Sequence, residues 1–207
     1  VRIEGDQADV WTGIQFPSAV PGLVSRVADI PAENVRFHQT YLGGGFGRRG
    51  SPSHIIEAAE IAKATGKTIQ LVWTREDDIQ QGPFRPASLM RIKAGIDNDG
   101  NLIAWDAARA GADISPDTFR SLLPALYSWM GDGMIEGVAN LSEWYFEKFA
   151  TDESSTEGLF EDYDHPNTRV THMTVDHELP MTFWRSVGHS YTAFAKESMI
   201  DEMAEVA

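Results

Sequence analysis

The segment YLGGGFGRRG, residues 41–50, concentrates residue types that suit close contact with a ligand. Four of the five positions 43–47 are glycine, and Phe46 is the only side chain among them. Uncovered backbone N–H groups donate hydrogen bonds to anionic oxygens. Arg48 and Arg49 follow directly, and guanidinium groups bind phosphate or pair with local carboxylates. A tight turn needs fewer glycines, so this composition favours a ligand-binding loop.

Two familiar nucleotide-binding loops do not fit the spacing of this segment. The G-x-G-x-x-G loop would need its third glycine where Arg48 stands, and an acidic residue about 20 positions downstream is missing. A phosphate-binding loop ending in G-K-[ST] would need a lysine followed by Ser or Thr, which is also missing. The remaining interpretation is a main chain that approaches a bulky ligand, with the Phe46 ring as an apolar wall.

Composition excludes several classes of function. The 207 residues carry a net charge of −14, which argues against nucleic acid or an anionic membrane as the main partner. The absence of cysteine excludes disulfides, thiolate zinc sites and cysteine-ligated iron–sulfur clusters on this chain. No apolar run approaches the roughly 18 residues that a membrane span needs. The six histidines show no zinc-binding spacing, so no metal-ligating residue is predicted.

Hydrophobic patterns predict alternating strands and helices. Strands are expected at 8–14, 35–40, 68–73, 89–96, 102–110 and 168–179. One short helix is expected with Pro21 in its first turn, and a second runs from an N-cap at Ser53 to a stop at Gly66. The region 117–150 is expected to be partly helical, and a final helix begins at an N-cap at Ser190. The Asp99-Gly100 pair predicts a hairpin, so the strands it joins are antiparallel. The expected fold class is therefore α+β, with mixed sheets and packed helices.

Two helices have a recognisable buried face, and one region is strongly acidic. In the helix expected after Ser53, the buried positions are Ile55, Ala58, Ala59 and Ala62. In the helix expected after Ser190, they are Tyr191, Phe194, Ala195, Ser198 and Met199. Residues 141–165 hold eight acidic residues and one lysine. This composition favours a solvated, partly mobile surface loop, placed as an insertion at about 147–165, over an acidic docking surface.

The order of several motifs resembles a known family. YLGGGFGRRGSPSH is followed by LVWTREDDI with PFRPAS, then HPNTRV, and finally MTFWRSVGHSYTAFAKESMIDEMA. This series is similar to the molybdenum-binding large subunit of the xanthine oxidase family of molybdenum hydroxylases. The branch it resembles most is the isoquinoline 1-oxidoreductase beta subunit with its aldehyde dehydrogenase relatives. The resemblance extends from Val10 to Ala204 and is weakest across the acidic region.

The resemblance implies roles for individual residues. A glutamine in the position of Gln15 hydrogen-bonds an oxygen ligand of molybdenum in family members, and Phe46 resembles an aromatic residue of the substrate channel. Arg185 stands where relatives have an arginine that orients substrate or cofactor. The cofactor-binding residues implied are Gln15, Gly44, Gly45, Phe46, Gly47, Arg48, Arg185, Ser186, Val187 and Gly188. Purine oxidisers carry an acidic residue where Gly50 stands and an aromatic one where Val187 stands, which argues against xanthine as substrate.

The family reaction inserts water-derived oxygen into an activated C–H bond, with molybdopterin cytosine dinucleotide as cofactor. The catalytic glutamate of the family lies outside this chain, so no catalytic residue is assigned here. The interpretation is that 1–207 is the first cofactor-binding portion of a larger subunit, inactive alone. Its implied partners are the rest of that subunit, a [2Fe-2S] subunit or other electron-transfer partner, and a small N-heteroaromatic or aldehyde substrate. Rival hypotheses are a non-catalytic nucleotide- or pterin-binding module and a structural fragment; the compartment stays open between bacterial cytoplasm and periplasm.

Overall fold

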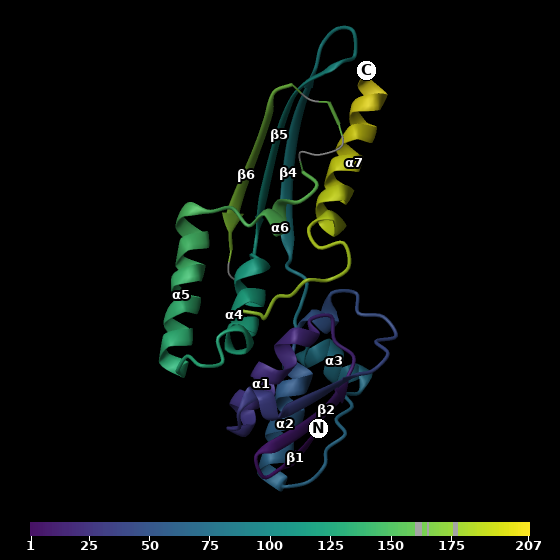
Figure 1. Ribbon diagram of the computed structural model, residues 1–207. Coiled ribbons are helices and arrows are strands. Elements are labelled where there is room, and N and C mark those ends of the chain that lie inside the picture. The colour runs from purple at the N-terminus through teal and green to yellow at the C-terminus, as the bar shows by residue number, and fades with distance from the viewer. Residues whose placement is uncertain (160–162, 165, 176–177) are drawn as a thin grey trace.

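The computed structural model describes residues 1–207 except 160–162, 165, 176 and 177. Two α+β parts lie end to end, the first built from β1 to α3 and the second from β4 to α7 (Figure 1). Each part has its own three-stranded sheet with one antiparallel and one parallel pair. The α+β class with mixed sheets is therefore confirmed. Figure 1 also shows the chain before α7 returning to the first part, and this return brings distant segments together.

The first part contains strands β1 (Arg2–Glu4), β2 (Gln7–Thr12) and β3 (Val35–Gln39), with β2 central. Helices α1 (Val20–Ala28) and α2 (Ser53–Thr65) pack on this sheet. Short 3₁₀ turns connect the elements: Pro17–Ala19, Ala32–Asn34 and Arg48–Gly50. The core comprises Ala8, Val10, Ile14, Val20, Val24, Val35, Ile55 and Ala59.

Helix α2 has the predicted buried face but a different beginning. All four of the expected stripe positions are buried: Ile55, Ala58, Ala59 and Ala62. Gly66 ends the helix in the left-handed conformation at φ 64°, as its type predicts. The N-cap prediction for Ser53 is wrong, because Pro52 occupies the cap and Ser53 is the first helical residue.

The predicted strand at 68–73 is wrong. The segment is extended and alternates between half-buried and exposed residues, yet it belongs to neither sheet. Its described backbone pairing is with Val1, which exchanges two hydrogen bonds of 2.8 Å with Ile69. A strand needs a continuous ladder of partners, and one residue pair does not supply it. Helix α3 (Arg75–Gln81) then begins at a capping box formed by Thr74 and Asp77.

The second part contains β4 (Ser88–Ile96), β5 (Leu102–Gly111) and β6 (Thr168–Thr174). The predicted hairpin joins β4 to β5, with Gly100 at φ 81°. Strand β6 ends earlier than the predicted range 168–179, part of which lies outside the described residues. Helix α7 (His189–Val206) packs against this sheet, and the buried core of the second part comprises Trp105 and Ala107 of β5 together with Leu159 from the chain before β6.

Within the acidic region, residues 141–149 and 153–156 are helical, so the interpretation as a loop is wrong for those residues, and the insertion at about 147–165 stays a prediction. Helix α4 (Ser115–Leu126) packs against α5 (Asp132–Phe149), and α6 (Glu153–Thr156) follows. Asp152 is buried, and its carboxylate accepts hydrogen bonds from Ile114 N–H at 2.7 Å and from nearby serine hydroxyls. Satisfying a buried carboxylate in this way ties α6 to α4, which composition alone did not indicate.

Helix α7 differs from the prediction at its start and on its buried face. It begins at His189 after Gly188, so Ser190 is not the N-cap. Phe194 was expected inside but its side chain is largely exposed, at 77%. Thr192 and Lys196 are buried instead, and Thr192 Oγ1 donates to the Glu157 carbonyl at 2.6 Å. Among the described residues, no helix is both long and apolar enough to cross a membrane.

Candidate functional site

The glycine loop and the loop that precedes α7 meet and enclose a pocket of about 390 Å³. The two loops are separated by more than a hundred residues in the sequence, so residues from both parts of the chain line this pocket. Its lining residues are Gln15, Phe16, Phe46, Gly47, Gly50, Thr118, Thr182, Phe183, Trp184, Arg185, Ser186 and Val187. Both loops singled out by their sequence motifs therefore face one space.

Direct contacts hold the two loops together at this pocket. The Arg185 guanidinium carbon lies 5.9 Å from the centre of the Phe46 ring, a distance at which a cation is attracted to an aromatic face. The main chain at Gly47 abuts the Phe183 carbonyl, because a Cβ at Gly47 would overlap that oxygen. Since Gly47 also has φ 81°, no other residue fits there without strain.

The protein's own groups explain part of the glycine content. A Cβ at Gly45 would lie 2.6 Å from Oε1 of Gln15, so this glycine lets the glutamine side chain cross the loop. Gly43 has nothing within 4 Å of its missing Cβ, and its φ of 68° is what glycine permits. Gly44 likewise lies against the Phe46 ring, so internal packing accounts for the glycines at 44, 45 and 47, and open space surrounds the missing Cβ at Gly43 alone among the four.

The rim of the pocket consists of backbone in an unusual conformation. Phe46, Ser186 and Val187 have positive φ values of 50°, 67° and 41°. Non-glycine residues rarely adopt this region, and such strain is concentrated at ligand sites. In the part of the chain that the structure describes, the N–H groups of Phe46, Gly47 and Ser186 donate to no protein acceptor. These donors are available to a bound group.

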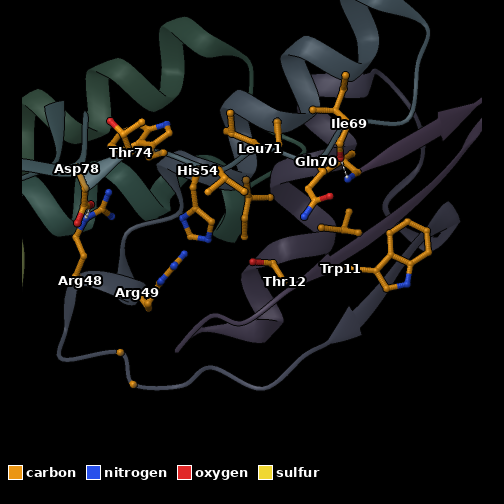
Figure 2. Close-up of a pocket in the computed structure, with 18 of the residues that line it drawn as sticks. Trp11, Thr12, Arg48, Arg49, His54, Ile69, Gln70, Leu71, Thr74 and Asp78 are labelled. Atoms are coloured by element: carbon orange, nitrogen blue, oxygen red, sulfur yellow. Dashed lines mark hydrogen bonds and ion pairs between the residues drawn. The ribbon is translucent and has the colours of Figure 1, made fainter. Parts of the chain in front are cut away.

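A larger hollow of about 1080 Å³ also borders the glycine loop and shares Phe46 and Trp184 with the smaller pocket; Figure 2 shows this hollow. Gly44, Gly45 and Phe46 line it from one end, and residues of β2, α2 and the segment 68–74 complete it. Figure 2 shows Arg49 and His54 together on one side of this space, with Trp11 on the opposite side.

Arg48 lies in this larger hollow rather than in the smaller pocket. Its guanidinium lies 3.3 Å from the Asp78 carboxylate and 5.6 Å from the centre of the Trp73 ring. Burial lowers the pKa of Arg48, and the Asp78 charge opposes that effect. Pairing with a local carboxylate, one of the two roles considered for this arginine, is the one observed.

The predicted cofactor residues thus fall into three groups. Gln15, Phe46, Gly47 and the run 185–187 line the smaller pocket. Gly44, Gly45 and Arg48 line the larger hollow, which Phe46 also borders. Gly188 lines neither; it is buried where a Cβ would meet the Ser154 carbonyl at 2.5 Å.

Several residues of the pocket were not predicted. Phe16 and Thr118 come from segments whose patterns signalled only structure, and nothing local distinguishes them. Thr182, Phe183 and Trp184 belong to the motif MTFWRSVG, so the motif itself was the available signal. Within the described residues, no group of three His, Asp or Glu side chains is placed to hold a metal ion.

The donor set fits a molybdenum–pterin cofactor better than a free metal ion. Gln15 offers a neutral amide whose side chain has no hydrogen-bond partner among the described residues, and Arg185 offers a cation. Backbone N–H groups at both loops can donate to oxygens of a large polar ligand. A ligand that brings its own metal ligands suits this combination of donors and apolar rings.

Known proteins are similar to this chain in sequence and in fold. The family model described as molybdopterin cofactor-binding domain matches residues 1–113. Isoquinoline 1-oxidoreductase subunit beta from Brevundimonas diminuta is 31% identical over 95% of this chain and 22% of its own length. Human aldehyde oxidase is 31% identical over 56% of this chain and 9% of its own length. The fold is similar to quinoline 2-oxidoreductase from Pseudomonas putida 86, with a TM-score of 0.68, 16% identity, and coverage of 95% of this chain and 22% of that one.

Proposed function

Because the chain belongs to the molybdopterin cofactor-binding domain family, we propose that its smaller pocket is one wall of a molybdenum cofactor site. The observation that carries the proposal is the meeting of Gln15, the Phe46–Gly47 backbone and the Arg185 loop around one space. The match spans 22% of the bacterial relative and 9% of human aldehyde oxidase, so the site would be completed by other parts of a larger subunit.

Each side of the pocket has a task suited to its chemistry. The Gln15 amide would orient the cofactor by hydrogen bonding without adding charge. The N–H groups of Phe46, Gly47 and Ser186 would donate to its oxygens, and Arg185 would supply positive charge toward anionic groups. The remaining proposed cofactor contacts, Gly44, Gly45, Arg48, Val187 and Gly188, would act through backbone or through loop position. When bound, the cofactor supplies the redox chemistry, while these residues hold it and exclude water.

We further propose that the complete protein hydroxylates an N-heteroaromatic compound or an aldehyde with oxygen from water. The relatives named for isoquinoline and for aldehydes support these two substrate classes. The cofactor would be the cytosine dinucleotide form, the electron acceptor a [2Fe-2S] partner, and the isolated chain inactive. These assignments rest on relatives of which the chain covers only a small part.

The test is an activity assay of the full-length protein with its partner subunits. Isoquinoline, quinoline and benzaldehyde would be offered in ¹⁸O-labelled water, and label in the product would support the proposed reaction. Gln15→Ala should lower molybdenum content or turnover at least about tenfold, because the loss of a hydrogen bond to a bound polar group is costly. Gln7→Ala, an exposed glutamine at the start of β2, is the matched control. Turnover and metal content that are unchanged in Gln15→Ala would contradict the assignment.

A further inference from the structure

We propose that Arg85 is a positioning residue that sets the shape of the loop 184–188 and its distance from the glycine loop. Arg85 belongs to the motif PFRPAS and lines neither pocket. The inference rests on the proposed function of the Arg185 loop, but it concerns how that loop is held and can fail separately.

The Arg85 guanidinium binds both carbonyls that flank the bend of this loop. Nη2 donates to the Arg185 carbonyl at 3.0 Å, and Nη1 donates to the Val187 carbonyl at 3.0 Å and contacts the Ser190 hydroxyl. Ser190 Oγ lies 3.1 Å and 3.0 Å from the same two carbonyls. One planar cation and one hydroxyl thus fix the backbone on both sides of Ser186.

This bend needs an external support. Ser186 and Val187 both have positive φ, a conformation that non-glycine residues keep only where their surroundings hold it. Its described internal backbone bond runs from Val187 N–H to the Trp184 carbonyl at 2.7 Å. Arg85 and the Ser190 hydroxyl are therefore the described side-chain contacts to both carbonyls of the bend, and Arg85 is the one that comes from a distant segment.

Residues 83 and 84, which precede Arg85, are hydrogen-bonded to residues 180–184, the chain that leads into the Arg185 loop. Phe84 N–H donates to the Pro180 carbonyl at 2.7 Å, and Thr182 N–H donates to the Phe84 carbonyl at 3.2 Å. The indole N–H of Trp184 donates to the Pro83 carbonyl at 3.2 Å. These bonds fix the backbone on the N-terminal side of Arg85 against residues 180–184, and this places the Arg85 guanidinium at the bend.

The segment that contains Arg85 also contacts the glycine loop, on the other side of the pocket from the Arg185 loop. Asp78, in the middle of α3, forms the ion pair with Arg48 beside the glycine loop. The stretch 78–85 consequently contacts both cofactor-facing loops, through Asp78 at one end and Arg85 at the other. A displacement of this stretch would change the separation between Phe46 and Arg185.

The chemistry of the contact requires arginine. A guanidinium presents parallel N–H donors in a fixed plane and can bind two carbonyls at once. A lysine at position 85 would keep the positive charge but could not hold both carbonyls in the same geometry. Arg85→Lys is therefore expected to restore only part of what Arg85→Ala removes.

The test is hydrogen–deuterium exchange on the full-length protein in its cofactor-free form, with molybdenum content measured separately on the loaded form. Arg85→Ala should speed amide exchange in residues 184–190 at least about tenfold, because two charge-assisted hydrogen bonds are lost. Arg85→Lys should show an intermediate rate. Arg169→Ala on β6, which removes an exposed ion pair with Asp106 on β5, should leave exchange in 184–190 unchanged.

The two measurements separate this inference from the proposed function. Faster exchange in 184–190 together with a lower molybdenum content in Arg85→Ala supports the positioning role. Exchange in 184–190 that equals the wild type in both Arg85 variants overturns it and leaves the cofactor assignment standing. Faster exchange with an unchanged molybdenum content overturns the assignment of this loop to the cofactor site, while the Arg85 clamp itself stands.

Discussion

At the scale of single residues, two glycines of one loop have different reasons to be glycine. Gly47 has φ 81° and its missing Cβ would overlap the Phe183 carbonyl, whereas Gly43 has φ 68° with open space around it. Gly47→Ala should therefore destabilise the protein by more than about 2 kcal/mol, and Gly43→Ala by only about 1 kcal/mol. Thermal unfolding of the two variants in cofactor-free full-length protein compares them directly. Equal losses of stability would show that the loops are not in contact at Gly47.

His54 makes the stability depend on pH. Burial, followed by the positive charges of Arg49 and Arg48, lowers the pKa of His54 to about 4. Its ring nitrogens are buried and form no hydrogen bond of good geometry with the described residues. Because the unfolded chain takes up this proton near pH 6.5, the free energy of unfolding should fall as the pH falls from about 6.5 to about 4, by at most about 3 kcal/mol.

The variant His54→Gln isolates this contribution. It removes the titrating group, so its stability should vary less between pH 4 and pH 7 than that of the wild type. Unfolding midpoints of both proteins measured across this range test the prediction. Curves that stay parallel at every pH would mean that His54 is solvated in the folded protein.

The sequence predicted the site better at some residues than at others. Gln15, Phe46, Gly47 and the run 185–187 were named in advance and line one pocket, because long motifs identify residues whose types depend on the ligand. Phe16 and Thr118 were not named, since their positions depend on how distant segments meet. Arg85 stood in a recognised motif without a role, because its partners are two carbonyls, which no side-chain pattern reveals.

At the scale of elements, one buried carboxylate links the three strands of the first sheet. Asp9 on β2 pairs with His38 and Arg36 on β3 at 2.8 Å and 2.9 Å, and with Arg2 on β1 at 2.7 Å. The hydrogen bond from His38, followed by those from the arginines, holds the pKa of Asp9 well below its usual range. Its stabilising effect is therefore present above the ordinary carboxyl pKa of about 4 and is lost as the pH falls.

Asp9→Asn should lower the unfolding temperature at neutral pH, and the difference from the wild type should shrink below pH 4. Asp6→Asn, an exposed aspartate in the turn before β2, serves as the control and should change little. Differential scanning calorimetry at pH 7 and at pH 3 supplies the comparison. A deficit in Asp9→Asn that is the same at both values would rule out the charged network as its cause.

Elements with strong local signals were predicted correctly, and those that depend on distant partners were not. The stripe of α2 and the β4–β5 hairpin follow from periodicity and turn chemistry within a few residues. The segment 68–73 has the composition of a strand but lacks a ladder of partners. On α7, Thr192 and Lys196 are buried and Phe194 is exposed, because polar groups there find partners that only the tertiary fold provides; the other four expected positions are half-buried.

At the scale of the whole molecule, we propose that the chain carries one side of a site rather than a complete one. The pocket is lined by residues of both α+β parts, and the chain corresponds to 22% of the bacterial relative. We therefore expect purified 1–207 to bind well below stoichiometric molybdenum and to hydroxylate neither isoquinoline nor benzaldehyde. Metal analysis by mass spectrometry and a turnover assay check this expectation. Stoichiometric molybdenum on this chain alone would instead favour a stand-alone binding module.

The central claim is that Gln15, the Phe46–Gly47 backbone and the Arg185 loop face a molybdenum-bearing pterin. A crystal structure of the full-length protein with its cofactor tests this most directly. The account predicts the cofactor in the 390 Å³ pocket, with its oxygens within hydrogen-bonding distance of the Gln15 amide and of backbone N–H groups at Gly47 or Ser186. A cofactor bound elsewhere, with this pocket filled by protein side chains, would contradict it.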